Sequence, residues 1–323
     1  MASLQSLTKP ILPLIISLRP LQWLKNVVLF APLVFSGFLF YKPQNEPSYF
    51  ATVFFSFVIF CLTTSSVYLV NDILDIKSDQ AHPVKKNRPI ASGALSVPLA
   101  IFFAIFGLTA VFFLSLSLSP FFQLLLFGYV MMQIAYSLKL KSLPILDVLT
   151  IASGFLFRIY AGAVVVNLHM NVWFLLTVVS ASLFLAVGKR QSERTLLHNN
   201  QLQPTRVTLH KYTDRLLDVY TSMFANATWL TYALFAFQSQ PSRYGPAIER
   251  FTELYTFLPR TLQSQKLLML TLPLVIFGVM RYLALVYEEN KGESPEKVLV
   301  KDKTLLTTVI CLILMIVFII YFD

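Results

Sequence analysis

The fold of this chain is decided by one stretch that directly follows an apolar run, Asn71-Asp72-Ile73-Leu74-Asp75-Ile76-Lys77-Ser78-Asp79. In a helix, residues three and seven positions apart share one face, so Asp72, Asp75 and Asp79 are expected to lie together. Carboxylates crowded in this way repel one another unless a cation lies among them, and a hard, oxygen-seeking ion such as Mg²⁺ is the natural occupant. The alternative is a solvated acidic face on a loop.

Basic residues follow the acidic stretch in the same connection. Lys85, Lys86 and Arg88 come after a His82-Pro83 step, which is expected to end the helix. Their side chains can bind the phosphate oxygens that a metal at the carboxylates would bridge. The acidic stretch and the basic residues that follow it together predict a site for a metal and a phosphate.

The composition places the stretch in a membrane protein. Hydrophobic residues make up 56% of the 323 residues and charged residues 13%, whereas about a quarter of a soluble domain is charged. The mean hydropathy is +0.67. We therefore predict an all-α integral membrane protein with about nine spans, near residues 24–41, 50–70, 97–117, 121–137, 145–166, 172–188, 219–238, 267–287 and 304–322.

The positions of the basic residues predict the orientation. Most of the 26 Lys and Arg residues fall in the N-terminal segment and in alternate connections, and positive residues favour the cytoplasmic side. The net charge of +10 is explained by this topology and by anionic phosphate ligands, so no nucleic acid partner is expected. We expect one polytopic domain over 1–323, with an interfacial N-terminal segment at 1–23, a cytoplasmic N-terminus and cytoplasmic loops at 71–96, 138–144, 189–218 and 288–303.

Charged and polar residues within or beside the spans are further candidates. Asp147 and Arg158 lie eleven residues apart, about three helical turns, and so point the same way at different depths. An arginine inside a span needs a partner, which is either a carboxylate on a neighbouring helix or a bound phosphate. Lys25 and Asn26 at the first span, and Lys139 and Lys141 after the fourth, are topological anchors or contacts to an anionic ligand.

The acidic stretch and the Arg88-Pro89 step resemble the first aspartate-rich motif of the UbiA superfamily of intramembrane prenyltransferases. Other segments resemble the branch that makes polyprenyl-phosphate phosphoribose, the decaprenyl-phosphate phosphoribosyltransferases. They are Arg19-Pro20-x-Gln22-Trp23-x-Lys25-Asn26, His82-Pro83 to Ser92-Gly93, Tyr136-Ser137-x-Lys139-x-Lys141, Leu146-Asp147, Gly188-Lys189-Arg190 with Glu193, and Arg281-Tyr282.

The resemblance implies a helix bundle around a central cavity, closed by cytoplasmic cap loops, in the cell membrane. It implies transfer of 5-phosphoribose from phosphoribosyl diphosphate to a polyprenyl phosphate, with Mg²⁺ held by Asp72, Asp75 and Asp79 and assisted by Asn71. The implied substrate-binding residues are Lys25, Asn26, Tyr68, Lys85, Lys86, Arg88, Tyr136, Lys139, Lys141, Asp147, Arg158, Lys189, Arg190 and Glu193. Nothing in the sequence excludes a homo-oligomer.

The segment after the sixth span separates this reading from an alternative within the superfamily. Members that transfer a prenyl group from its diphosphate to an aromatic acceptor carry a second aspartate-rich motif there, whereas this chain has Lys189-Arg190 and the single acid Glu193. A donor with an extra phosphate would use such cations. A transporter of anionic solutes is disfavoured, because the charges gather at helix ends and no repeat is visible.

Overall fold

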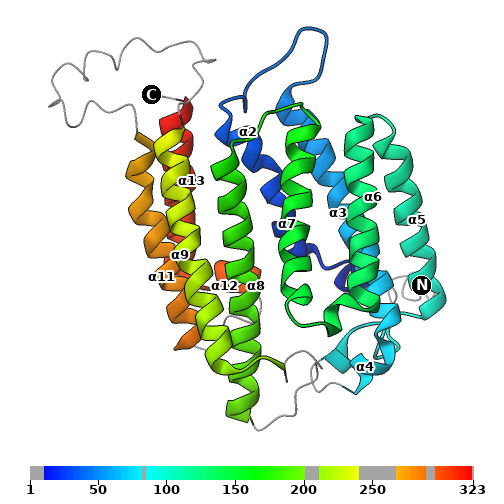
Figure 1. The fold of residues 1–323 in the computed structure, drawn as a ribbon. Coiled ribbons are helices and arrows are strands. Elements are labelled where there is room, and N and C mark those ends of the chain that lie inside the picture. The colour runs from blue at the N-terminus through cyan, green and yellow to red at the C-terminus, as the bar shows by residue number, and fades with distance from the viewer. Residues whose placement is uncertain (1–10, 82–84, 201–210, 240–266, 289–294, 322–323) are drawn as a thin grey trace, which may run out of the picture.

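The computed structural model describes residues 11–81, 85–200, 211–239, 267–288 and 295–321, and within them every regular element is a helix (Figure 1). The long helices are α3 (Tyr49–Leu74), α5 (Val97–Ser115), α6 (Pro120–Leu138), α7 (Leu146–Val164), α8 (Val172–Asn200), α9 (Asp214–Gln238), α11 (Leu272–Tyr287) and α13 (Lys303–Tyr321). The short ones are η1 (Pro20–Phe30), α2 (Ala31–Phe35), α4 (Ile76–Gln80), η2 (Lys85–Asn87), η3 (Leu140–Ser142), η6 (Leu267–Thr271) and α12 (Pro295–Lys301).

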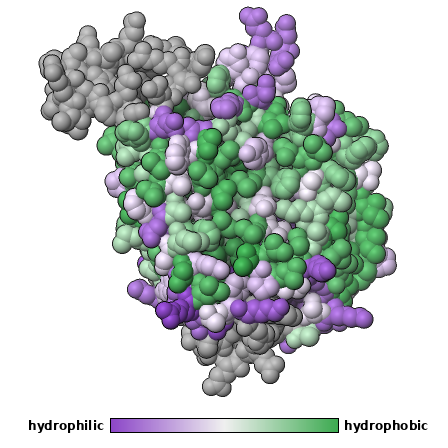
Figure 2. Space-filling view, viewed as in Figure 1, coloured by the Kyte–Doolittle hydropathy of each residue, from purple (hydrophilic) through white to green (hydrophobic). Residues whose placement is uncertain are grey.

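Eight helical segments of the described chain are long and apolar enough to cross a membrane, which confirms the predicted all-α integral membrane protein. The span expected at 219–238 is the helix α9, which is not among these eight because polar side chains such as Asn226 and Thr228 dilute its apolar sequence. Figure 2 shows a broad apolar belt between two more polar ends. The belt is what contact with lipid chains requires.

The first helical segment begins earlier than predicted. The apolar run suggested a span at 24–41 preceded by an interfacial segment at 1–23, but the segment covers Ile11–Phe35. It is interrupted at Arg19, whose backbone is left-handed with φ 53° and ψ 61°. Pro20 follows, and a proline disfavours the α conformation of the residue before it. Residues Pro20–Phe30 then continue as a 3-10 helix.

The helix ends at the site also differ from the expected loops. α8 continues to Asn200, so Lys189, Arg190 and Glu193 lie on a helix and not in the loop predicted at 189–218. Part of the loop predicted at 288–303 is the helix α12. His82 and the stretches 201–210 and 289–294 lie outside the described residues.

Close packing brings the broken first segment against α7. A Cβ on Gly162 would lie 2.0 Å from the carbonyl oxygen of Leu29, so only glycine permits this approach of η1 to α7. Leu29 belongs to a core that also contains Phe60, Phe122 and Tyr129. This packing sets η1 beside α3 and α7, the helices that carry Asn71, Asp72, Asp147 and Arg158.

Candidate active site

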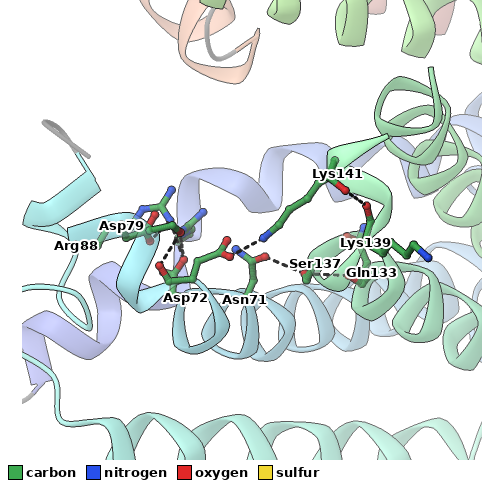
Figure 3. A network of polar contacts seen from close by, with 12 residues as sticks. Asn71, Asp72, Asp79, Arg88, Gln133, Ser137, Lys139 and Lys141 are labelled. Atoms are coloured by element: carbon green, nitrogen blue, oxygen red, sulfur yellow. Dashed lines mark hydrogen bonds and ion pairs between the residues drawn. The ribbon is translucent and has the colours of Figure 1, made fainter. Parts of the chain in front are cut away.

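The acidic stretch lies at one end of the bundle, where α3 gives way to α4 (Figure 1). Arg88 Nη1 donates to Asp72 Oδ1 at 3.1 Å and to Asp79 Oδ2 at 2.6 Å (Figure 3). Both carboxylates are almost completely buried, whereas about a quarter of the arginine side chain is exposed. One guanidinium nitrogen therefore bridges two of the three predicted carboxylates.

A second arginine completes this arrangement. Arg19 Nη2 donates to the same oxygen of Asp72 at 2.5 Å, and its guanidinium lies over the Tyr68 ring, 4.9 Å from the centroid. Trp23 beside it donates to Ser65 at 3.0 Å, which ties the first segment to α3. A cavity of about 240 Å³ opens here, lined by Ile16, Ser17, Arg19, Asp72, Asn87, Arg88 and Pro89.

Asp75 turns to different partners. It follows the last residue of α3, and Lys141 Nζ donates to its Oδ1 at 2.5 Å. Next to it, Ser137 on α6 donates to Asn71 Oδ1 at 2.8 Å (Figure 3). We define the acidic-motif network as Arg19, Asn71, Asp72, Asp75, Asp79, Arg88, Ser137 and Lys141. It joins the first segment, α3, α4, the connection after η2, α6 and the α6–α7 connection.

The predicted metal site can be tested against this geometry. Among the residues that the structure describes, no three His, Cys, Asp or Glu side chains are close enough together to hold a metal. The break at Asp75 and the separate cations divide the three carboxylates, so they do not converge as the helical spacing suggested. Asp72 and Asp79 do flank one cationic nitrogen, and carboxylate oxygens are the ligands that Mg²⁺ prefers. The carboxylate oxygens of Asp72 and Asp79 therefore suit Mg²⁺ at the position that Arg88 Nη1 occupies in this structure.

Arg158 lies deeper in the bundle and is 5% exposed. It donates from Nε to Asn26 Oδ1 at 2.6 Å, from Nη1 to the Gly154 carbonyl at 2.6 Å and from Nη2 to the Tyr129 hydroxyl at 2.8 Å. Of the two partners expected for it, a carboxylate is not found among its hydrogen bonds. The charge is held by neutral oxygen atoms and by the Tyr129 ring, 4.9 Å away.

Asp147, Arg190, Glu193 and Tyr212 form a second buried cluster. Arg190 is completely buried and donates to Asp147 Oδ2 and to Glu193 Oε2, each at 2.7 Å. Tyr212 donates to Asp147 Oδ1 at 2.8 Å and accepts from the Ile145 amide at 2.6 Å. Burial raises the pKa of the Tyr212 phenol well above its usual range, and the adjacent Asp147 charge acts in the same direction, so the phenol stays neutral.

The structure therefore divides the predicted residues among three places. Asn71, Asp72, Asp75, Asp79, Arg88 and Lys141 meet in the acidic-motif network, Asn26 joins Arg158, and Asp147 joins Arg190 and Glu193. Arg190 lies inside an ion-paired cluster. The remaining candidates are half-buried or exposed side chains, namely Lys25, Tyr68, Lys85, Lys86, Tyr136, Lys139 and Lys189.

Sequence reasoning missed four contributors: Arg19, Tyr129, Ser137 and Tyr212. Arg19 and Ser137 lay within segments that carried the family resemblance, so a signal existed but was assigned no role. Tyr129 and Tyr212 contact partners 29 and 65 residues away. No local pattern encodes contacts at such separations.

Comparisons with known proteins show which family the chain resembles along most of its length. The profile of the UbiA prenyltransferase family matches residues 29–296. The chain is 34% identical over 295 residues to the decaprenyl-phosphate phosphoribosyltransferase of Mycolicibacterium smegmatis, covering 90% of this chain and 87% of that one. It is 33% identical to the protein of the same name from Corynebacterium glutamicum over 92% and 85% of the two chains.

Solved structures support the same fold. A UbiA homolog from Archaeoglobus fulgidus bound to GPP and Mg²⁺ superposes with a TM-score of 0.63 at 16% identity, covering 95% of this chain and 99% of the other. At that identity the likeness concerns the fold alone. Together with the profile match and the bacterial relatives, it leads to one conclusion: the chain belongs to the UbiA prenyltransferase family.

Proposed function

We propose that this protein transfers a 5-phosphoribosyl group from 5-phosphoribosyl 1-diphosphate to the phosphate of a polyprenyl phosphate and releases diphosphate. The observation that carries the proposal is the likeness, over most of both chains, to proteins named decaprenyl-phosphate phosphoribosyltransferase. The acidic-motif network supports it, because it combines carboxylates for a metal with cations for phosphates at one end of the bundle.

The acceptor explains why the site needs no general base. A phosphate monoester loses its second proton with a pKa of about 6, so it is already a nucleophile at neutral pH. Its oxygen attacks the anomeric carbon of the ribose as the bond to diphosphate breaks. Cations that neutralise the leaving diphosphate lower the barrier, because negative charge grows on it in the transition state.

The residues then have distinct roles. Asp72 and Asp79, with Asp75 and Asn71 beside them, would hold Mg²⁺, which neutralises the diphosphate and makes it a better leaving group. Lys85, Lys86 and Lys189 contact the donor phosphates, and Arg88 contacts a phosphate of one of the two substrates. Lys25, Lys139 and Lys141 contact the acceptor phosphate or the 5-phosphate of the donor.

The two buried clusters hold these groups in place. Arg158 fixes Asn26 next to Lys25, and Arg190 holds Asp147 at the start of α7, directly after the connection that carries Lys139 and Lys141. A cation bound in a fixed position loses less entropy when it meets its ligand. The site faces the cytoplasm, the side on which basic residues at the ends of membrane spans are retained.

The test uses purified protein in detergent with Mg²⁺. One reaction contains labelled phosphoribosyl diphosphate and polyprenyl phosphate, and a parallel reaction contains labelled prenyl diphosphate and 4-hydroxybenzoate. We expect the label to enter the lipid in the first reaction. Product in the second reaction alone would replace this proposal by prenyl transfer to an aromatic acceptor.

A further inference from the structure

Two guanidinium groups converge on a single carboxylate oxygen. Arg19 Nη2 and Arg88 Nη1 lie 2.5 and 3.1 Å from Asp72 Oδ1, and Arg88 also contacts Asp79. The two arginines thus match the two aspartates in charge. If a metal takes over Asp72 and Asp79, both guanidinium groups lose their counter-ions at the same time.

The backbone of Arg19 is held in an unfavourable conformation. Its φ of 53° lies in the left-handed region, which side chains other than glycine rarely adopt. Such residues persist where the surroundings fix them, and they concentrate at binding sites. The Tyr68 ring on one side and Asp72 on the other fix this guanidinium. It is therefore pre-positioned before any ligand arrives.

The arginines, and not the aspartate, face open space. The side chains of Arg19 and Arg88 are 24% and 27% exposed, whereas that of Asp72 is 3% exposed. All three line the cavity of about 240 Å³, together with Ile16, Ser17, Asn87 and Pro89. A ligand in this cavity meets positive charge first.

We propose that Arg19 and Arg88 bind a phosphate group in this cavity. When the metal, with the diphosphate bound to it, takes Asp72 and Asp79 as ligands, the two arginines leave these carboxylates and donate to the oxygens of the phosphate group. A phosphate dianion matches two guanidinium groups in charge and in paired hydrogen bonds. This inference rests on the proposed function for the presence of metal and diphosphate. The lipid headgroup of the acceptor and the 5-phosphate of the donor share this chemistry.

The test measures binding to the whole protein in detergent by calorimetry, with Mg²⁺ and inorganic diphosphate present throughout. Farnesyl phosphate represents the lipid source, and ribose 5-phosphate represents the donor source. The variants are Arg19→Gln, Arg19→Lys and Asn87→Trp, of which the last fills the cavity without removing a charge. Arg281→Gln is the matched control, because its side chain is 28% exposed and pairs with Asp302 at 2.6 Å.

We expect Arg19→Gln and Asn87→Trp to lower the affinity for one of the two ligands by about 10-fold or more. Arg19→Lys should recover part of that loss, and Arg281→Gln should bind like the wild type. The ligand that is weakened identifies the source of the phosphate. Equal affinity of wild type and Arg19→Gln for both ligands, or no binding of either to the wild type, would overturn the proposal.

The same experiment is separable from the transfer assay. Arg19-dependent phosphate binding without transfer from phosphoribosyl diphosphate would refute the proposed function and leave this site standing. Transfer from phosphoribosyl diphosphate, together with ligand affinities that do not depend on Arg19, would refute this site and leave the proposed function standing. If an Arg19 variant lost its melting transition, Asn87→Trp would replace it in the test, because residue 87 is exposed.

Discussion

Asp147 on α7 and Arg190 on α8 form an ion pair in which both side chains are completely buried. The pair is surrounded by Glu193 and Tyr212, so Arg190 is neutralised within the protein. Its role is to join α7 to α8 through two residues that are 43 positions apart in sequence. This gives the pair an effect on stability that can be separated from catalysis.

Breaking the pair on one side should destabilise the bundle strongly. Arg190→Met leaves the buried Asp147 carboxylate without its cation, a loss of about 3–5 kcal/mol in comparable pairs. Asp147→Asn leaves Arg190 paired with Glu193 and should cost less. Thermal unfolding in detergent measures it. The double variant Asp147→Asn with Arg190→Met should be more stable than the sum of the two losses predicts. An Arg190→Met protein with wild-type melting and a raised donor KM would return Arg190 to phosphate binding.

Removing a carboxylate from the acidic motif should abolish turnover without unfolding the protein. Asp72→Asn and Asp79→Asn keep the shape of the side chain but weaken a Mg²⁺ ligand, so we expect a loss of about 100-fold or more in kcat/KM. The control is Asp214→Asn, because Asp214 is an exposed partner of Arg194 away from the network. Near-normal activity of both variants over a Mg²⁺ titration would remove the metal assignment.

Two glycines offer a matched test of helix packing. A Cβ on Gly162 would lie 2.0 Å from the Leu29 carbonyl oxygen, whereas at Gly278 the nearest atom, Thr308 Cγ2, lies 4.0 Å away. Gly162→Ala should therefore cost about 1–3 kcal/mol by forcing α7 away from η1. Gly278→Ala should be neutral or stabilising, by up to about 1 kcal/mol of helix propensity. Equal melting temperatures of the Gly162→Ala and Gly278→Ala proteins would show that the first segment moves away from α7 without loss of stability.

Arg158 should not tolerate replacement by lysine. Its guanidinium donates in three directions, to Asn26, Gly154 and Tyr129. An ammonium group at the end of a flexible stem cannot reproduce that planar geometry. We expect Arg158→Lys to lower the melting temperature and to raise the acceptor KM, because Asn26 and its neighbour Lys25 lose their fixed position. Tyr129→Phe removes one of the three bonds and should give a smaller change in both quantities.

Hydropathy alone predicts most of the spans, because lipid contact demands long apolar runs whatever the packing inside. It predicted the first span at 24–41, whereas the helical segment covers Ile11–Phe35. The left-handed backbone of Arg19 allows helix on both sides of the polar Arg19-Pro20 pair. It also ended the sixth span at residue 188, although α8 continues to Asn200 as a polar helix beyond the apolar stretch. An apolar run marks where lipid contact ends and not where the helix ends.

The composition of the site was predictable, but the pairing of its charges was not. The stretch from Asn71 to Asp79 identified the carboxylates, and the connection beyond it identified Arg88. Helical spacing predicted that Asp75 lies with Asp72 and Asp79. Because α3 ends at Leu74, Asp75 instead accepts a hydrogen bond from Lys141. That partner lies 66 residues away, so its choice depends on tertiary packing.

Every member of the acidic-motif network lies between residues 19 and 141. During synthesis these residues leave the ribosome before α8 and the helices that follow it. The aspartates can thus acquire their basic partners while the second half of the chain is still being made. The nascent protein is spared a stage in which unpaired carboxylates stand at the membrane surface, and the later helices are added to a half-bundle whose charges are already balanced.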